Sequence, residues 1–208
     1  IALLVIGIEE YGLKDGNFSS ILDTYVKISN RAKEDESIDQ KAFYYLQQVE
    51  SGNTEMVQKF KEITDICVER QLQIFDTLDI HFDVFTHESD FVYNNYLDNI
   101  LKRLDKTGRL HEDELGRLYV DLSGYDIPTR EPVLVLTRSN KTSLYPMRDI
   151  AYTIHKIELN PKNNFIVLGE DQEVYMKQIS AVLDILGYKA PKLISYSYVL
   201  LDGDKMST

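Results

Sequence analysis

The chain has 208 residues, and its 43% hydrophobic and 27% charged content is that of an ordinary soluble globular protein. A formal net charge of -11 disfavours unspecific adhesion to nucleic acid or anionic lipid, which requires clustered Lys and Arg side chains. The single cysteine, Cys67, excludes an internal disulfide and a metal site built from cysteines.

The chain opens with the apolar run IALLVIGI, which is too short to span a bilayer and lacks the basic flank of a signal peptide. We therefore expect no membrane association and a cytoplasmic location. The following region, Phe18 to Asp105, is predicted to be almost wholly helical because its apolar residues recur at helical spacing. Separate helices are expected over 18–34, over 41–50, from 54 to about 78, and from about 90 to 107.

From Pro132 onward, short apolar runs alternate with helical patterns. Strands are predicted in PVLVLTR, NFIVLG and KLISYSYVLL, and helices in RDIAYTIHKIEL and from Asp171 to Leu186. This alternation is typical of βαβ units and a parallel sheet, so the expected class is α/β. Ligands of such sheets bind beyond the carboxyl ends of the strands. Three polar clusters are expected at that edge.

The first cluster is LYPMRD, in which Tyr145 and Asp149 are four residues apart at the predicted start of a helix. That spacing places both on one side of the helix. A carboxylate beside a phenolic hydroxyl suits a cationic group, particularly a planar guanidinium. The alternative is that Asp149 only complements the positive helix end while Arg148 pairs locally.

The second cluster is LGEDQ, Leu168 to Gln172. Gly169 at a strand end permits close approach of a ligand to the backbone, and Gln172 offers an amide that can orient an amino or carbonyl group. The alternative is that Asp171 is only the N-cap of the next helix.

The third cluster is DGDKMST at the end of the sequence. The charge of Lys205 and the hydroxyl of Ser207 suit a triphosphate whose negative charge rises during displacement. The alternative is a solvated surface turn.

Together these stretches resemble a known family. KMST is similar to the lysine-methionine-serine signature loop of class I aminoacyl-tRNA synthetases. LYPMRDIAYTIHK, IVLGEDQEVYMKQISAVLDILGY and IALLVIGIEEYG resemble segments of arginyl-tRNA synthetases. The ordered series Tyr-x-x-Arg-Asp, Gly-x-Asp-Gln and Lys-Met-Ser is the specific part of this likeness. The sequence lacks the His-Ile-Gly-His motif of the family, so we expect an internal segment that does not aminoacylate alone.

The resemblance implies a Rossmann-type catalytic domain. Residues 1–17 would end the region of the first half, 18–110 would form a helical insertion, and 111–208 would form the second half with the signature loop. Such a domain activates L-arginine with ATP and Mg2+ to arginyl-adenylate, and then transfers the arginyl group to tRNA(Arg). The full-length protein would make the tRNA contact.

The resemblance also implies roles for individual residues. Tyr145 and Asp149 would bind the arginine guanidinium, and Gln172 would bind its amino group. The nucleotide would be bound by Gly169, Lys205, Met206 and Ser207, with Lys205 and Ser207 acting on the departing pyrophosphate. No protein ligands for a metal are predicted.

Two other functions remain open from the sequence: another class I synthetase or nucleotidyltransferase, and a non-catalytic arginine-binding relative. The role of the helical region also remains open, because it would suit tRNA contact, cover of the active site or enlargement of the core. A basic cluster near its end is the candidate for tRNA contact: Lys102, Arg103, Lys106 and Arg109.

Overall fold

The structure is a computed structural model. It describes residues 1–13, 18–87, 89–93, 96–159, 161–197, 200–201 and 204–205. By its internal contacts the chain divides into two compact units, Ile1–Thr86 and His87–Thr208. Each unit has its own hydrophobic core.

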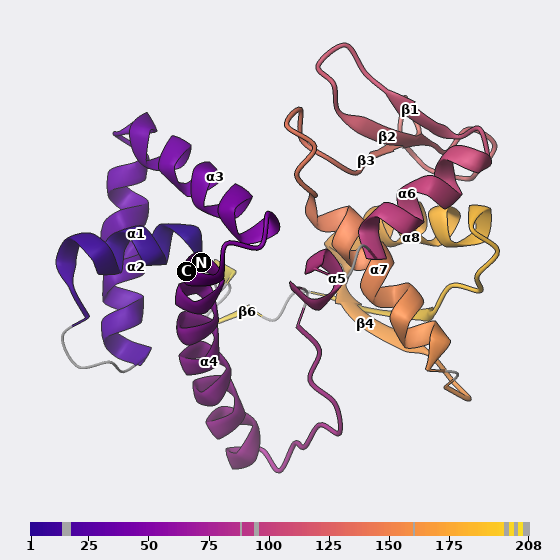
Figure 1. The fold of residues 1–208 in the computed structure, drawn as a ribbon. Helices are drawn as coiled ribbons and strands as arrows, with labels where there is room; N and C mark the ends of the chain where they lie inside the picture. Colours follow the sequence, from indigo (N-terminus) through magenta and orange to yellow (C-terminus); the bar gives the residue numbers. More distant parts are fainter. Residues whose placement is uncertain are drawn as a thin grey trace. The chain divides into compact units, whose positions relative to one another are not determined.

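Unit Ile1–Thr86 consists of helices in its described part, drawn in indigo and purple in Figure 1. These helices are α1 (Ala2–Tyr11), α2 (Phe18–Ala32), α3 (Glu36–Glu50) and α4 (Thr54–Thr77). Asp35 and Asn53 begin α3 and α4, since their side-chain oxygens accept hydrogen bonds from the backbone amides of Ser37 and Met56. The predicted helical region is confirmed here, although α3 starts earlier than expected because Asp35 caps it.

Helix α1 contacts each of the other three helices, and its apolar residues supply much of this core. Ile6 on α1 and Ile28 on α2 are fully buried. The buried face of α2 runs through Ile21, Thr24 and Ile28, whereas the hydrophobic side chains of Leu22 and Tyr25 on the same helix are exposed. The core face is therefore narrower than the apolar pattern predicts.

Unit His87–Thr208 contains a three-stranded antiparallel sheet with β2 in the middle. Its strands are β1 (Leu110–Glu112), β2 (Leu118–Asp121) and β3 (Val133–Val135). The sequence predicts the strand at β3 correctly, but the expectation that it joins a parallel sheet is wrong. Strand β3 pairs antiparallel with β2, with Val120 opposite Leu134.

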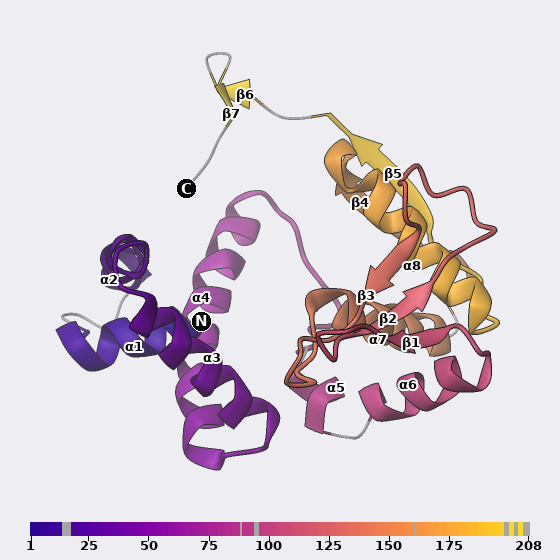
Figure 2. The ribbon, with the colours of Figure 1, turned by 90° about the horizontal axis from the view of Figure 1, so that it is seen from above.

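The parallel part of this unit is the pair β4 (Phe165–Gly169) and β5 (Lys192–Tyr196), which lie side by side in Figure 2. Helix α8 (Glu173–Ile185) connects them, so the predicted βαβ unit is confirmed. In register, Gly169 lies opposite Tyr196, and both are at the carboxyl ends of their strands.

This unit also contains the helices α5 (Ser89–Tyr93), α6 (Tyr96–Lys106) and α7 (Tyr145–Glu158). Helices α7 and α8 pack together through buried aliphatic side chains, including Ile150, Ile154 and Ile179. The class is therefore α/β, as predicted. In the described ranges, none of the helices is both long enough and apolar enough for a membrane crossing.

Two residues of the basic cluster at the end of α6 and just after it make hydrogen bonds within this unit. The guanidinium of Arg103 donates to the hydroxyl of Tyr188 at 2.7 Å and to the carbonyl of Leu186 at 2.9 Å. Arg109 donates to the carbonyls of Asp121 and Ser123 at 3.1 and 3.0 Å. Two of the four candidate tRNA-contact residues are thus used to hold neighbouring segments together.

Candidate active site beside Asp149

The segment that follows β3 fixes where α7 begins. Thr137 and Ser143 form an isolated antiparallel bridge across a turn. The guanidinium of Arg148 reaches back to the carbonyl and the hydroxyl of Ser143, at 3.0 and 3.1 Å. Pro146 lies in the first turn of α7, where its missing amide hydrogen costs nothing. These contacts place Tyr145 at the start of the helix, as the sequence predicts.

Tyr145 and Asp149 lie one helical turn apart on α7, and both contact Tyr175 of α8. The hydroxyl of Tyr175 donates to Oδ2 of Asp149 at 2.5 Å. The rings of Tyr145 and Tyr175 have centroids 5.2 Å apart and are tilted by 48°. Tyr145 remains 58% exposed, whereas Asp149 and Tyr175 are half-buried. The predicted pair therefore lies on one side of α7, beside the first turn of α8.

The corner at Gly169 lies directly before that turn. Strand β4 ends at Gly169 and continues into the short 3-10 helix η1 (Glu170–Gln172). A side chain at position 169 would come within 2.6 Å of Oδ1 of Asp171, so glycine leaves room for this carboxylate. Oδ2 of Asp171 accepts a hydrogen bond of 3.0 Å from Nε2 of Gln172. The hydroxyl of Ser197, just after β5, donates to Glu170 at 2.8 Å and joins the two strand ends.

The alternative interpretation of Asp171 as a helix N-cap is wrong. The N-cap residues of η1 and α8 are Gly169 and Gln172, and neither makes a side-chain capping bond. Asp171 lies inside η1 and binds the amide of its neighbour instead. The Asp171 carboxylate lies beside Gly169 and places negative charge at this corner.

The field of Asp149 also acts along its own helix. Lys156 lies two turns after Asp149, with its amine 4.5 Å from the ring centroid of Tyr152. Burial lowers the pKa of Lys156, and the negative charge of Asp149 opposes that shift by favouring the ammonium form. The charge of Asp149 therefore offsets part of the effect of burial on the pKa of Lys156, which stays lowered.

The signature segment is described only in part. Strand β6 (Leu200–Leu201) pairs antiparallel with β7 (Asp204–Lys205), with the backbone of Lys205 opposite Leu200. The prediction of one strand through 192–201 is wrong, since β5 ends at Tyr196 and β6 belongs to this hairpin. The candidate residues Met206 and Ser207 lie outside the described residues.

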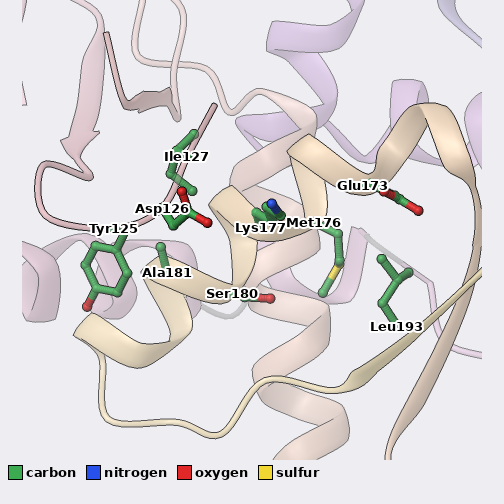
Figure 3. A pocket seen from close by; sticks show the side chains of 9 residues that line it. All are labelled: Tyr125, Asp126, Ile127, Glu173, Met176, Lys177, Ser180, Ala181 and Leu193. Carbon is green, nitrogen blue, oxygen red and sulfur yellow. The ribbon is translucent and has the colours of Figure 1, made fainter. Parts of the chain in front are cut away.

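A cavity of about 570 Å³ opens on a different face of α8 (Figure 3). It lies between the loop at Tyr125 and the helix, and Tyr145, Asp149 and Tyr175 do not line it. Its walls are formed by Tyr125, Asp126, Ile127, Glu173, Met176, Lys177, Ser180, Ala181 and Leu193. The predicted cation site is therefore a surface at the meeting of α7 and α8 rather than part of this cavity.

Sequence reasoning did not identify Tyr175. Tyr175 lies three residues after Gln172, in the first turn of a helix that the sequence predicts. Its partner Asp149 is 26 residues away in sequence, and the contact depends on how α7 and α8 pack. Aromatic residues at helical spacing are usually read as core, so local pattern alone gave no sign of a site role.

The sequence matches the family described as "tRNA synthetases class I (R), catalytic domain" over residues 1–208. Among curated proteins, it is 31% identical to the arginine--tRNA ligase of Archaeoglobus fulgidus over 208 residues, which are 100% of this chain and 36% of that protein. It is 34% identical to the arginine--tRNA ligase of Methanococcus maripaludis (strain C6), over 100% of this chain and 37% of that protein. The chain thus spans little more than a third of these relatives.

The fold is similar to that of a solved arginyl-tRNA synthetase from Thermus thermophilus. The TM-score is 0.75 at 20% sequence identity, and the match covers 99% of this chain and 41% of that one. The family match over the whole chain and this similarity in fold agree. The chain belongs to the family of class I arginyl-tRNA synthetase catalytic domains.

Proposed function

We propose that this chain is the arginine-binding part of a longer arginine–tRNA ligase. The full-length protein would activate L-arginine with ATP to arginyl-adenylate and transfer the arginyl group to tRNA(Arg), in the cytoplasm. The observation that carries the proposal is the arrangement of Tyr145 and Asp149 on one turn of α7, in contact with Tyr175 in the first turn of α8, the helix that follows the corner at Gly169. The printed names of the curated relatives support it.

In this proposal, each candidate residue has a defined task. Asp149 accepts hydrogen bonds from the substrate guanidinium, and Tyr145 covers its plane or donates its hydroxyl beside it. Gln172 orients the amino group of arginine from η1. The adenylate lies close to the backbone at Gly169. Lys205, Met206 and Ser207 belong to the loop beside the nucleotide, where Lys205 and Ser207 stabilise the departing pyrophosphate.

We further propose that β4 and β5 belong to the second half of a Rossmann-type sheet. Parallel sheets are normally covered on both faces, but one face of this pair is open in the described part of the chain. Its apolar side chains Phe165, Val167, Ile194 and Tyr196 are 51%, 60%, 49% and 52% exposed. A face of this kind suits a sheet whose remaining strands and covering layer come from elsewhere in the protein.

The division into 1–17, 18–110 and 111–208 is also a proposal. The boundary between the two compact units in the sequence lies between Thr86 and His87, inside the range 18–110. Helix α1 lies in the range 1–17, but it folds with α2, α3 and α4 of the proposed insertion in one compact unit. Helix α6 would pack with the second half instead, because it contacts α7 and β1.

Mg2+ fits this proposal as a companion of ATP. In the described residues, no three His, Cys, Asp or Glu side chains gather closely enough to hold a metal ion. Mg2+ commonly binds through substrate phosphates, water and one or two carboxylates, and Asp171 and Glu170 are the acidic side chains at the Gly169 corner. When bound, the ion would neutralise phosphate charge, while Asp149 and Gln172 would hold the amino acid in position.

The proposal is tested by ligand binding to the full-length protein. Arginine is compared with lysine, glutamine and cysteine by the shift of the thermal midpoint. A ligand at a hundredfold excess over its Kd stabilises the folded state by about 2.7 kcal/mol. Of the four amino acids, only arginine should raise the midpoint, and ATP with Mg2+ should raise it further. Stabilisation by another amino acid, and none by arginine, would assign the chain to a different substrate.

Activity separates a ligase from a non-catalytic arginine-binding relative. The full-length protein should exchange pyrophosphate into ATP in an arginine-dependent reaction. Binding of arginine without any exchange would favour the binding protein. Neither result depends on the roles given to single residues.

A further inference from the structure

Tyr175 contacts both Tyr145 and Asp149, the two residues that bind the arginine guanidinium in the proposed function. Its hydroxyl donates to Asp149 at 2.5 Å and its ring contacts that of Tyr145. The backbone beneath it is firmly held, because Met176 and Ile179 on α8 are buried in the core. Ile150, next to Asp149 on α7, is fully buried in the same core. The contact therefore joins two fixed helices.

We propose that Tyr175 is a positioning residue that orients the carboxylate of Asp149 toward the guanidinium of the substrate. The inference rests on the proposed function and adds a residue to it. A hydrogen bond from a hydroxyl to a carboxylate is short and strong, and it limits rotation of the aspartate side chain. A guanidinium needs this limit more than an ammonium does, because its planar donors match a carboxylate in only certain orientations.

The proposal fixes the sign of the effect of removing the hydroxyl. If the hydroxyl orients Asp149, its loss weakens arginine binding, because the aspartate is then less well oriented before the ligand binds. If it instead occupied the place of the guanidinium, its loss would strengthen arginine binding. The two cases therefore predict opposite changes in the same measurement.

The test compares Tyr175→Phe with Tyr125→Phe in the full-length protein. Tyr125 is a matched control because its hydroxyl also donates to an aspartate at 2.8 Å, but to Asp184 in the last turn of α8 rather than to Asp149 on α7. We expect Tyr175→Phe to raise the KM for arginine about tenfold, the range for a lost hydrogen bond to a charged group. The KM for ATP and the thermal midpoint without ligand should remain close to those of the parent, and Tyr125→Phe should leave both KM values unchanged.

A double-mutant cycle tests whether Tyr175 acts through Asp149. Asp149→Asn keeps the shape of the side chain but removes its charge. In that background, Tyr175→Phe should weaken arginine binding by much less than tenfold, because the carboxylate to be oriented is gone. The exchange rate is followed with arginine raised until it can be measured. Equal factors in both backgrounds would overturn the proposal.

The remaining outcomes are also decisive. An arginine KM within twofold of the parent, or a lower one, in Tyr175→Phe overturns the positioning role but leaves the proposed function intact if Asp149→Asn is impaired. A rise in the KM values of both arginine and ATP, together with a lower thermal midpoint, also overturns the positioning role, since these changes indicate a structural role for Tyr175. An unimpaired Asp149→Asn contradicts the site in the proposed function itself.

Discussion

The hydroxyl of Tyr45 on α3 lies 2.5 Å from Oε2 of Glu9 on α1 and donates a hydrogen bond to it. The same carboxyl group accepts from the amine of Lys59 on α4 at 3.0 Å and from that of Lys41 at 3.3 Å. One side chain of α1 thus ties two neighbouring helices to it. This polar junction lies beside the apolar core of the unit Ile1–Thr86, to which Tyr45 also contributes.

Glu9→Gln should loosen this junction. Burial acts to raise the pKa of Glu9, but the hydrogen bonds from Tyr45, Lys59 and Lys41 outweigh it, so its pKa is lowered from the ordinary 4.5. A carboxyl group with a lowered pKa stabilises the fold above its ordinary pKa, and this contribution is lost as the pH falls through the lowered value. At neutral pH we expect a loss of about 1–2 kcal/mol, measured as faster amide hydrogen exchange in α1.

The matched control for this prediction is Glu55→Gln. Glu55 also pairs with Lys59, at 3.2 Å, but its side chain is 80% exposed. An exposed pair of this kind contributes about 0–1 kcal/mol, so exchange in α1 should hardly change. The gap between the two variants should narrow as the pH drops below 4.5. A gap independent of pH would contradict the role given to the charge of Glu9.

Gly7→Ala should destabilise the crossing of α1 and α2. A Cβ at this position would lie 2.8 Å from Cγ2 of Thr24 and 3.2 Å from Cβ of Ile28. Overpacking of a tight core costs about 1–3 kcal/mol, which exceeds the gain of about 1 kcal/mol from alanine in a helix. Amide exchange in α1 and α2 should therefore accelerate.

A second substitution checks the cause. Thr24→Ser removes the methyl group that the new side chain meets, while a serine can keep the hydrogen bond from the Thr24 hydroxyl to the carbonyl of Ser20. Combined with Gly7→Ala it should restore part of the lost protection, although the contact with Ile28 remains. Slower exchange in the single variant Gly7→Ala would show that the helices have room at this crossing.

Cys67 should react slowly with alkylating reagents. It packs against the core cluster of the unit Ile1–Thr86, and burial raises the pKa of its thiol. Since only the thiolate is nucleophilic, iodoacetamide at pH 8 should modify native Cys67 at least about tenfold more slowly than it modifies glutathione. Modification in urea provides the control, because unfolding should remove the difference. A native thiol as reactive as glutathione would contradict its packing.

Much of the helical architecture could be predicted because its signals are local. Apolar spacing and the cap at Asn53 place α4 within a residue or two of the observed helix. The alternation of strands and helices likewise gives β4, α8 and β5. The antiparallel sheet escaped prediction, because the apolar run at β3 has the same period whichever strand it pairs with. Its partner β2 is only four residues long, and no strand was expected there.

The candidate site could be predicted only where its residues lie in one helix. The spacing of Tyr145 and Asp149 within one helix shows that they share a side, and the structure places them so. The third member of the cluster, Tyr175, comes from another helix, and no local pattern reports how two helices pack. The substrate-binding roles of Tyr145 and Asp149 stay predictions, as do those of Gly169, Gln172 and Lys205, since each depends on a bound substrate.

Asp149→Ala in the full-length protein tests the central claim most directly. The measurement is arginine-dependent exchange of pyrophosphate into ATP, with arginine affinity determined in parallel. If Asp149 binds the guanidinium, the variant should lose exchange and bind arginine at least about a hundredfold more weakly, because an ion pair with two hydrogen bonds is removed. Exchange and arginine affinity equal to those of the parent would contradict the assignment of this site.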